Sequence, residues 1–231
     1  VYIDTGTYTN GTVRITNLDA AGDASSPITY TGPTNGAVAI FSNSGVRNGF
    51  VLSNARNVHV RAITIRGFTN GVYVAHGGAI NMSISNELRG LTIRSNDTYG
   101  VWLNGTGVDG NRIVSNTIDS GASGAFQDYG VYVGSGDMNL FTNNTIRGHS
   151  LYGVYMDGGA ATNTVRGNTI RSNDLYGIYL SGAGADGNRI VSNMIDSGAL
   201  GTFQSTGVWV ASGDMNILTN NTIRGHSLYG V

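Results

Sequence analysis

The chain lacks several residue types, and each absence narrows the functions open to it. Its 231 residues include no Cys, no Lys and a single Glu, Glu87. Without Cys it forms neither disulfides nor thiolate metal sites. The formal net charge is −1, so no excess of positive charge argues for a nucleic acid or an acidic membrane surface as partner. No run of about 18 apolar residues is present, so we expect no membrane span.

Repetition is the main positive feature of the sequence. Residues 101–154 and 178–231 are identical at 40 of 54 aligned positions, without a gap, at an offset of 77 residues. An active site is normally built once, whereas a stacking unit is useful many times. The duplication therefore indicates architecture first and chemistry only second.

A shorter period lies inside the 77-residue unit. The pattern Asn-x4-Asn-x-(Ile/Leu) recurs every 24–30 residues, and Gly-(Val/Ile)-(Tyr/Trp) segments close the units. Short β-branched runs separated by Gly, Asn, Asp and Ser predict strands joined by turns. About three strands per unit predict an all-β parallel β-helix (β-solenoid) of about nine coils of 24–30 residues. The six copies of the pattern begin at Asn81, Asn111, Asn139, Asn163, Asn188 and Asn216.

Stacked coils would bring equivalent side chains into columns inside the solenoid. We expect two inward aliphatic columns and, at one turn, a ladder of asparagines whose amides bond to the coils above and below. The first column would be Ile65, Leu88, Ile118, Ile146, Ile170, Ile195 and Ile223, and the second Val72, Val101, Val131, Val154, Ile178 and Val208. The ladder would be Asn86, Asn116, Asn144, Asn168, Asn193 and Asn221.

These strand starts, Tyr-Gly-Val closures and Asn turns resemble the repeats of the right-handed parallel β-helix family in the pectate-lyase-like superfamily. The resemblance covers roughly residues 49–231. The opening stretches VYIDTGTY (1–8), TVRIT (12–16) and SPITYTGP (26–33) are similar to the first coils of bacterial secreted β-helix proteins, including some polysaccharide lyases. The resemblance implies a right-handed parallel β-helix.

The domain organisation follows from these repeats. We expect one β-solenoid domain over residues 1–231, with irregular N-terminal coils over 1–56 and regular coils over 57–231. The chain starts on a strand-like segment and stops in mid-coil at Val231, without the cap that solenoids need. We therefore expect it to be a piece of a longer protein.

The outward positions include a column of aromatic residues. Each member sits between two inward residues, so alternation points it outward. Cross-strand aromatic pairing alone would explain the column, and a platform for sugar rings or a partner protein would explain it equally well. A second row, Tyr99, Tyr129, Tyr152, Tyr176 and Tyr229, is expected at the inner edge of the turn. The outward column is Tyr73, Trp102, Tyr132, Tyr155, Tyr179 and Trp209.

The charged residues argue modestly against catalysis. Lyases of the resembled superfamily use a Lys or Arg base, often with calcium. Five of the 13 Arg here fall into one outward stripe with two Asp, which favours a solvated ladder. Four aspartates, Asp109, Asp137, Asp186 and Asp214, read as separate turn residues rather than paired catalytic carboxylates. Calcium between them is the alternative. The stripe is Arg66, Arg89, Asp119, Arg147, Arg171, Asp196 and Arg224, with Arg94 as the alternative to Arg89.

Histidines and methionines add no site of their own. His149 and His226 occupy the same repeat position, so neither is expected to be a unique acid–base group. His59 and His76 are single, and the five Met residues form no cluster with them in the sequence, which makes a soft-metal site improbable. We predict no catalytic residue, no metal site and no cofactor.

Loop lengths predict a shallow groove on one side. The interval from the inward apolar residue of a strand to the following tyrosine position is 11 residues in three coils, over 88–99, 118–129 and 195–206. The same interval is only 6 residues in the two intervening coils, over 146–152 and 170–176. The loops 120–128 and 197–205 would protrude and flank these shorter coils. Neutral insertions explain the lengths at least as well. The groove residues would be Phe126, Gln127, Phe203 and Gln204.

The function expected from the sequence is structural or adhesive. The segment would form part of a rod, spike or filament outside the cell or on its surface, and it would contact polysaccharide or other copies of itself through its side faces. The alternative is a polysaccharide lyase or epimerase acting on uronic-acid polymers. Near-exact duplication, the absence of Lys and the lack of converging carboxylates favour the first.

Overall fold

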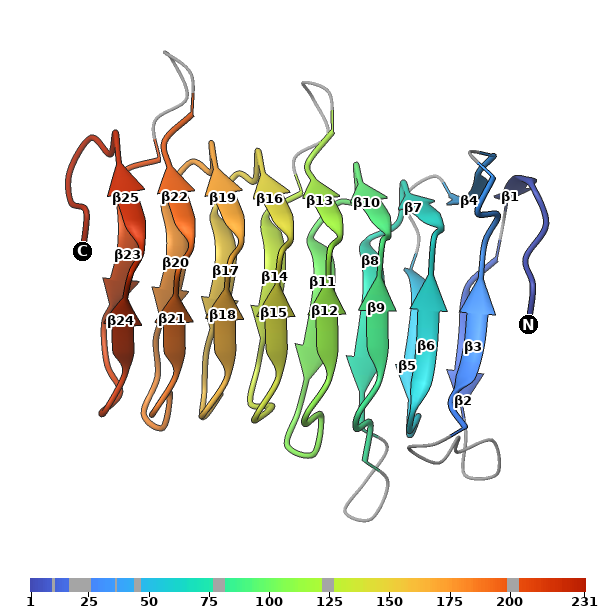
Figure 1. The fold of residues 1–231 in the computed structure, drawn as a ribbon, viewed down its shortest axis with the longest axis horizontal. Coiled ribbons are helices and arrows are strands. Elements are labelled where there is room, and N and C mark those ends of the chain that lie inside the picture. The colour runs from blue at the N-terminus through green and yellow to red at the C-terminus, as the bar shows by residue number, and fades with distance from the viewer. Residues whose placement is uncertain are drawn as a thin grey trace.

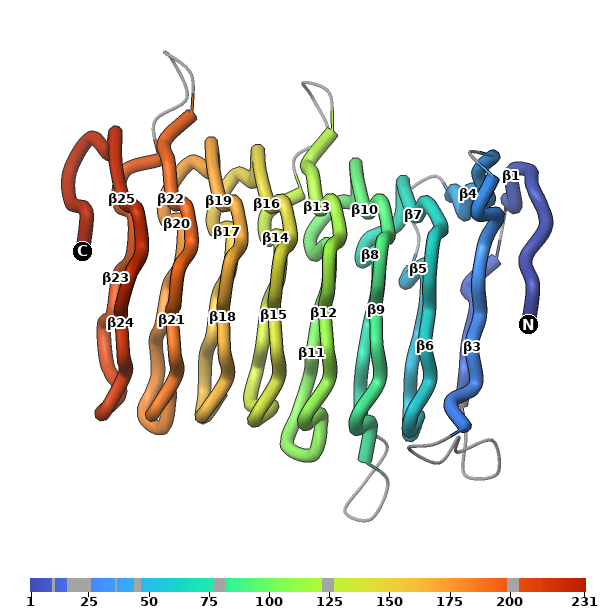
Figure 2. Tube along the Cα trace, viewed as in Figure 1, coloured from blue at the N-terminus to red at the C-terminus, as the bar shows by residue number. Residues whose placement is uncertain are grey.

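The computed structural model describes residues 1–9, 11–16, 26–35, 37–43, 47–76, 82–121, 127–198 and 204–231. These residues form short strands in three parallel sheets, and consecutive strands belong to different sheets. The chain therefore winds as a coil that adds one strand to each sheet per circuit, with the two termini at opposite ends (Figure 1, Figure 2). No helix occurs in the described ranges. The expected all-β parallel solenoid is confirmed.

The predicted number of coils was too high. Two of the three sheets contain eight strands each in the described chain, which does not complete nine circuits. Six circuits, from Asn86 onward, carry the asparagine repeat described below. A count of nine coils assumes one uniform repeat length, whereas irregular and longer segments take up part of the chain.

The first sheet is built from Thr-Ile-Arg-like triplets whose middle residue points inward. Its inward column runs through Phe41, Ile65, Ile93 and Ile118 and continues through the later isoleucines. The prediction that Leu88 belongs to this column is wrong, since Ile93 is paired there. The strands, in sheet order, are β1 (Gly6–Thr9), β4 (Ala39–Ser42), β7 (Thr64–Arg66), β10 (Thr92–Arg94), β13 (Thr117–Asp119), β16 (Thr145–Arg147), β19 (Thr169–Arg171), β22 (Met194–Asp196) and β25 (Thr222–Arg224).

The second sheet contains the Gly-(Val/Ile)-(Tyr/Trp) segments. The predicted column from Val72 to Val208 is in register and fully buried. The strands are β2 (Val13–Thr16), β5 (Asn48–Ser53), β8 (Asn70–Ala75), β11 (Tyr99–Asn104), β14 (Tyr129–Val133), β17 (Tyr152–Met156), β20 (Tyr176–Leu180) and β23 (Thr206–Val210).

The third sheet holds Leu88, between Val60 and Ile113 in a further buried column. The strands, in sheet order, are β24 (Ile217–Thr219), β21 (Arg189–Val191), β18 (Thr164–Arg166), β15 (Leu140–Thr142), β12 (Arg112–Val114), β9 (Glu87–Arg89), β6 (Val58–Arg61) and β3 (Ile28–Thr31). The solenoid thus has an apolar interior enclosed by three sheets.

A column of glycines explains how coils approach closely at the second sheet. A Cβ atom added at Gly153 would lie 2.6 Å from the carbonyl oxygen of Gly177 and 2.7 Å from Cγ2 of Ile170. Both neighbours lie one coil further along, so a side chain would force adjacent coils apart. The invariant Gly before each Val or Ile is therefore a packing requirement.

The predicted asparagine ladder is in fact two separate ladders. In each, a side-chain oxygen accepts a hydrogen bond from the backbone N–H of the equivalent residue one coil earlier. In every rung of the first ladder given below, and in the first two of the second, it also accepts from that residue's side-chain amide. Asn144 Oδ1, for example, accepts from Asn116 N at 2.9 Å and Asn116 Nδ2 at 3.0 Å. The side-chain amide donates to a backbone carbonyl, as Asn144 does to Ile113 at 2.8 Å. One ladder is Asn116, Asn144, Asn168, Asn193 and Asn221. The other is Asn86, Asn111, Asn139, Asn163, Asn188 and Asn216.

The assignment of Asn86 to the ladder with Asn116 is therefore wrong. The backbone N–H of Leu91, not that of Asn86, donates to Asn116, because the pattern around Asn81 is shifted by one asparagine position relative to the later copies. Residue 81 itself lies outside the described ranges.

A third internal ladder mixes amides with imidazoles. Phe68 N donates to Asn96, whose amide donates to Gln127 at 3.1 Å. His149 follows on the next coil and its backbone N–H donates to Asn173. The order Asn, Gln, His then repeats 77 residues later. The members are Asn96, Gln127, His149, Asn173, Gln204 and His226.

Candidate functional site

The outward face of the second sheet carries two aromatic rows, here called the aromatic face. The first row is the predicted column, and its members pair in register from β8 to β23. The second row, predicted at the inner edge of the turn, is instead half-exposed and interleaved with the first; Tyr99, for example, lies 4.8 Å from Trp102 between ring centroids. The first row is Tyr73, Trp102, Tyr132, Tyr155, Tyr179 and Trp209, and the second is Tyr99, Tyr129, Tyr152 and Tyr176.

Most of these rings cover one another's faces. Tyr152 and Tyr176 stack at 5.2 Å with an interplanar angle of 4°, and Tyr155 and Tyr179 at 4.9 Å with 15°. In such stacks each ring covers part of its neighbour, and the hydroxyls of Tyr73 and Tyr132 are bonded to Asn104 and Asp157. Trp209 is 38% exposed because its strand, β23, is the last of the second sheet and no further coil of this sequence covers it. The aromatic face therefore offers partly exposed ring edges along its length.

Acidic groups lie beside the tyrosine hydroxyls. The hydroxyl of Tyr132 donates to Asp157 Oδ2 at 3.2 Å. Burial, with the nearby Asp157 carboxylate, raises the pKa of Tyr132 to about 12. Burial also raises the pKa of Tyr155. These hydroxyls keep their protons at neutral pH and act as hydrogen-bonding groups.

The loop-groove prediction is partly wrong. Phe126 and Phe203 lie outside the described residues. Gln127 and Gln204, expected to protrude, are fully buried in the third internal ladder. The register also shows that the segment after Ile93 is as short as in the coils of β16 and β19. The first of the three long intervals, 88–99, was therefore a consequence of misplacing Leu88.

The Arg–Asp stripe and the turn aspartates are structural contacts. Arg94, rather than Arg89, occupies the second place of the stripe. Asp119 pairs with Arg147 at 2.6 Å and Asp196 with Arg224 at 2.6 Å. In the turns, Asp109 accepts from the backbone N–H of Asp137 at 2.8 Å, as expected for turn residues.

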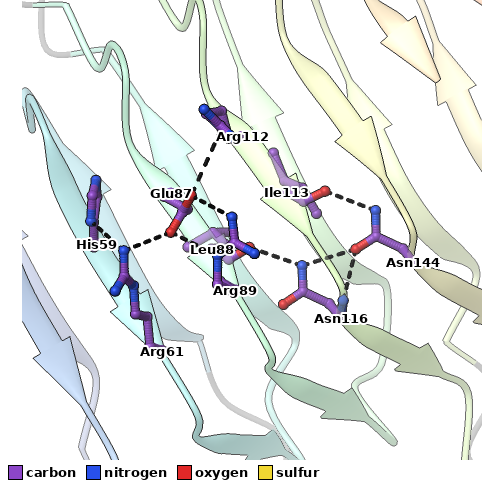
Figure 3. A network of polar contacts seen from close by, with 9 residues as sticks. All are labelled: His59, Arg61, Glu87, Leu88, Arg89, Arg112, Ile113, Asn116 and Asn144. Atoms are coloured by element: carbon purple, nitrogen blue, oxygen red, sulfur yellow. Dashed lines mark hydrogen bonds and ion pairs between the residues drawn. The ribbon is translucent and has the colours of Figure 1, made fainter. Parts of the chain in front are cut away.

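A compact charged cluster lies on the outward face of the third sheet (Figure 3). We call it the Glu87 cluster: His59, Arg61, Glu87, Arg89 and Arg112. Glu87 is only 5% exposed. It accepts hydrogen bonds from Arg61 at 2.9 Å and from Nε and Nη2 of Arg89 at 3.0 Å each, and its Oε2 lies 3.8 Å from Nε of Arg112.

The register of three strands assembles this cluster. His59, Glu87 and Arg112 occupy one outward column of β6, β9 and β12. Arg61 and Arg89 occupy the column two residues on. The cluster was not predicted from the sequence because Arg89 was assigned to the stripe of the first sheet. One feature of the sequence could have revealed the cluster: the single Glu of the chain, Glu87, stands two residues before Arg89 and one coil after His59 and Arg61.

The electrostatics of the cluster leave positive charge in excess. Hydrogen bonding from Arg89 outweighs burial and lowers the pKa of Glu87 to about 2. Burial lowers the pKa of His59 below its ordinary value, so the ring is neutral at pH 7. Three guanidinium groups against one carboxylate leave two net positive charges. The side chain of Arg112 is 53% exposed.

A shallow depression of about 220 Å³ lies at the corner between the third and first sheets. Ala62 and Gly90, which line it, directly follow Arg61 and Arg89 in the chain. A Cβ atom added at Gly90 would meet nothing within 4 Å. The lining residues are Pro33, Ala37, Val38, Ala62, Ile63, Thr64, Gly90 and Thr92.

The described residues offer neither a metal site nor a membrane-spanning helix. Within the described residues, no group of three or more His, Cys, Asp or Glu side chains is arranged to hold a metal ion. In the same part of the chain, no helix has the length and apolar character needed to cross a membrane.

The fold defines the class of protein to which the chain belongs. Residues 48–223 match the family described as right handed beta helix region, and since this match covers most of the chain, the protein belongs to that family. A search of curated proteins found no match.

Solved structures with a similar fold include enzymes and a viral tailspike. An alginate lyase from Paenibacillus sp. str. FPU-7 is 15% identical, with a TM-score of 0.56 over 99% of this chain and 89% of that one. The periplasmic alginate epimerase AlgG is 12% identical, with a TM-score of 0.53 over 94% and 61%. The Dettilon tailspike protein is 13% identical, with a TM-score of 0.54 over 99% and 61%. At these identities the likeness shows the fold alone.

Proposed function

We propose that this chain is a rigid segment of a structural or adhesive protein located outside the cell or on its surface, and that its side faces contact polysaccharide or neighbouring copies. The observation that carries the proposal is the aromatic face. Its ten rings connect through centroid distances between 4.7 Å and 6.4 Å along one side of the solenoid. A contiguous, partly exposed aromatic surface on a soluble protein usually marks a contact with another molecule.

The geometry of the rings suggests how that contact is made. Stacked tyrosines present ring edges, and hydroxyls of the second row would hydrogen-bond to sugar hydroxyls or to the polar rim of another protein. Trp102 and Trp209 carry the largest rings of the first row and are the best candidates for direct contact with a sugar. Repetition of the same groups at each coil suits a repetitive ligand such as a polymer.

Replacing Trp209 by Ala tests this proposal. The change removes the exposed indole, so we expect weaker retention on a polysaccharide panel, or weaker self-association in sedimentation, with little change in the thermal midpoint. The control is Met215→Ala, which also removes an exposed apolar side chain (80% exposed) but lies outside the aromatic face. If both variants behave like the parent protein in both assays, the aromatic face is not a contact surface.

A polysaccharide lyase or epimerase acting on uronic-acid polymers is the second candidate, because His59 is neutral and adjoins three arginines. A neutral imidazole is a suitable base, and guanidinium groups neutralise a uronate carboxylate. One contact argues against it. Arg61 Nη2, which only donates, lies 2.9 Å from His59 Nδ1, so the lone pair that would accept a substrate proton is already occupied.

Solvent exchange separates the two functions. Both lyases and epimerases remove the proton next to the uronate carboxylate, so incubation of polyuronates in D₂O would place deuterium there or yield an unsaturated product. We expect neither. Deuterium incorporation that disappears in His59→Gln would establish catalysis and displace the adhesive assignment.

A further inference from the structure

The arginines of the regular coils lie on two sides of the solenoid only. Over residues 57–231, every Arg belongs to a strand of the first or third sheet. The strands of the second sheet contain no Arg from β8 to β23. Since the chain also lacks Lys, the aromatic face carries no strongly basic side chain. The arginines of this range are Arg61, Arg66, Arg89, Arg94, Arg112, Arg147, Arg166, Arg171, Arg189 and Arg224.

Negative charges border the aromatic face at both ends of its strands. A set of aspartates stands in the turns that join the second sheet to the first and to the third. The salt bridges among the described residues all involve Glu87, Asp119 or Asp196, so none of these turn aspartates takes part in one. The hydrogen bond from the Tyr132 hydroxyl to Asp157 places one of them directly beside the rings. The turn aspartates are Asp97, Asp109, Asp128, Asp137, Asp157, Asp174, Asp186 and Asp214.

The outward face of the first sheet has the opposite character, and we call it the arginine face. It carries a column that is Thr in all but one of the coils from β7 to β25 and, two residues on, the Arg–Asp stripe. Five Arg against two Asp leave three net positive charges in the stripe. Among the described residues, Arg66, Arg94 and Arg171 form no salt bridge. The stripe is Arg66, Arg94, Asp119, Arg147, Arg171, Asp196 and Arg224.

We propose that the aromatic face of one copy binds the arginine face of a second copy, so that copies associate side by side. This contact rests on the proposed function, since it names a second copy as the partner of the aromatic face. A guanidinium group stacks on aromatic rings and also pairs with carboxylates. The arginines of one copy therefore meet both the rings and the bordering aspartates of the next, and each face satisfies charges that the other lacks.

The spacing of the two faces matches as well. Each face presents one member of each column per coil, and neighbouring coils are about 4.8 Å apart. Arg147 and Arg171 are paired on β16 and β19. Tyr155 and Tyr179 are paired in the same way on β17 and β20. A second copy thus presents arginines at the interval at which the rings recur, and the short Thr side chains beside them allow close approach.

The same charges disfavour pairing of two aromatic faces. Such a dimer would bring the turn aspartates of both copies together, and like charges across an interface are strongly unfavourable. The contact with the arginine face is heterologous, because each copy uses a different face. Every added copy leaves one face of each kind free, so association continues as a row instead of closing at a dimer.

Reciprocal charge reversal tests the contact by sedimentation of the whole chain. Arg94→Glu/Arg171→Glu reverses charge on the arginine face, and Asp97→Arg/Asp174→Arg reverses it beside the aromatic face, all four at exposed positions. Each variant should associate at least about tenfold more weakly than the parent protein, because like charges then meet. An equimolar mixture of the two variants should regain association, since opposite charges face each other again. Misfolded chains would not show this recovery.

A matched control and a milder variant accompany the reversal. Arg166→Glu/Arg189→Glu makes the same change of charge at exposed positions on the third sheet and should alter association by less than about twofold. Arg94→Gln/Arg171→Gln removes two charges without adding repulsion within the sheet and should weaken association about fivefold. Association of the parent protein should also weaken as the ionic strength rises from about 0.01 M to about 1 M.

Other results would overturn the inference. Parental association in both arginine-face variants, or no recovery in the mixture, would remove the first sheet as the partner surface. Equal weakening in the third-sheet control would indicate diffuse charge in place of a defined face. A parent protein that stays monomeric at every concentration and ionic strength would exclude contact between copies. It would leave polysaccharide retention, which the Trp209 experiment measures, and with it the broader proposal, intact.

Discussion

His149 lies inside the solenoid with its Nδ1 atom 3.4 Å from Nε2 of Gln127, one coil earlier. The pair recurs 77 residues later as His226 and Gln204, also at 3.4 Å. His149 is fully buried, and its Nε2 has no hydrogen-bond partner among the described residues. Two ionisable rings, His149 and His226, have thus been built into a ladder whose other members are amides.

The burial of His149 predicts acid sensitivity. Burial lowers its pKa to about 4, while the unfolded chain titrates near 6.5. As pH falls from about 6.5 to about 4, the unfolded state takes up a proton that the folded state does not, and stability falls by up to about 3 kcal/mol. In His149→Asn this pH dependence should shrink in urea unfolding at pH 7 and pH 5. An unchanged dependence would place the titrating group elsewhere.

Asn144 is predicted to be structurally essential. Replacement by Ala orphans the carbonyl of Ile113 and the backbone N–H of Asn116 inside the coil. Buried groups left without partners cost about 1–3 kcal/mol each, so we expect a loss of roughly 2–5 kcal/mol in unfolding free energy. Met138→Ala, at a 64% exposed side chain, is the control. If Asn144→Ala and Met138→Ala lose similarly small amounts of unfolding free energy, the asparagine ladder is not a source of stability.

Gly153 is predicted to tolerate no side chain. Gly153→Ala would place a methyl group 2.6 Å from the Gly177 carbonyl oxygen, and we expect a loss of about 1–3 kcal/mol from overpacking. Gly11→Ala is the matched control, because a Cβ there meets nothing within 4 Å. Thermal unfolding of the two variants measures the difference in their stability. Equal stability of Gly153→Ala and Gly11→Ala would contradict the prediction, because it would mean that the coils separate locally without cost.

Glu87 is predicted to stabilise the fold only above acidic pH. Its pKa of about 2 lies below the unfolded value near 4.3, so its contribution is complete above about pH 4.3 and is lost as pH falls toward 2. Glu87→Gln should cost about 1 kcal/mol at pH 7 because its arginine partners are partly exposed. The variant and the parent should converge near pH 2. A gap that stays constant with pH would argue against an ionised Glu87.

Repetition made the fold predictable, while the interior polar residues were less so. The column from Val72 to Val208 followed from alternation alone, because each copy has the same spacing from its glycine. Leu88 and Asn86 were misplaced because the asparagine pattern slips by one position in that coil. Gln127 was placed outside because loop residues are usually polar and exposed, whereas here its amide continues an internal ladder that pairs Asn, Gln and His from different coils.

Of the two candidate sites, one was predictable from the sequence and the other was not. The aromatic column was predictable in register, since Trp102 and Tyr132 occupy the same place in their repeats. The Glu87 cluster was not, because it occurs once and depends on which strand Arg89 joins. A repeat reveals what recurs, and a single cluster becomes visible only when the strands are aligned in space.

The central claim is that successive coils stack in register, so that each face carries columns of equivalent residues. Because the chain has no Cys, a pair of introduced cysteines tests it directly. Thr145 and Thr169 are paired on β16 and β19, about 4.8 Å apart, within disulfide reach. The double variant Thr145→Cys/Thr169→Cys should therefore cross-link under mild oxidation. Thr117→Cys/Thr169→Cys, two coils apart at about 9.6 Å, should stay reduced. Cross-linking of the second pair but not the first would contradict the stacked arrangement on which the columns, the aromatic face and the Glu87 cluster all depend.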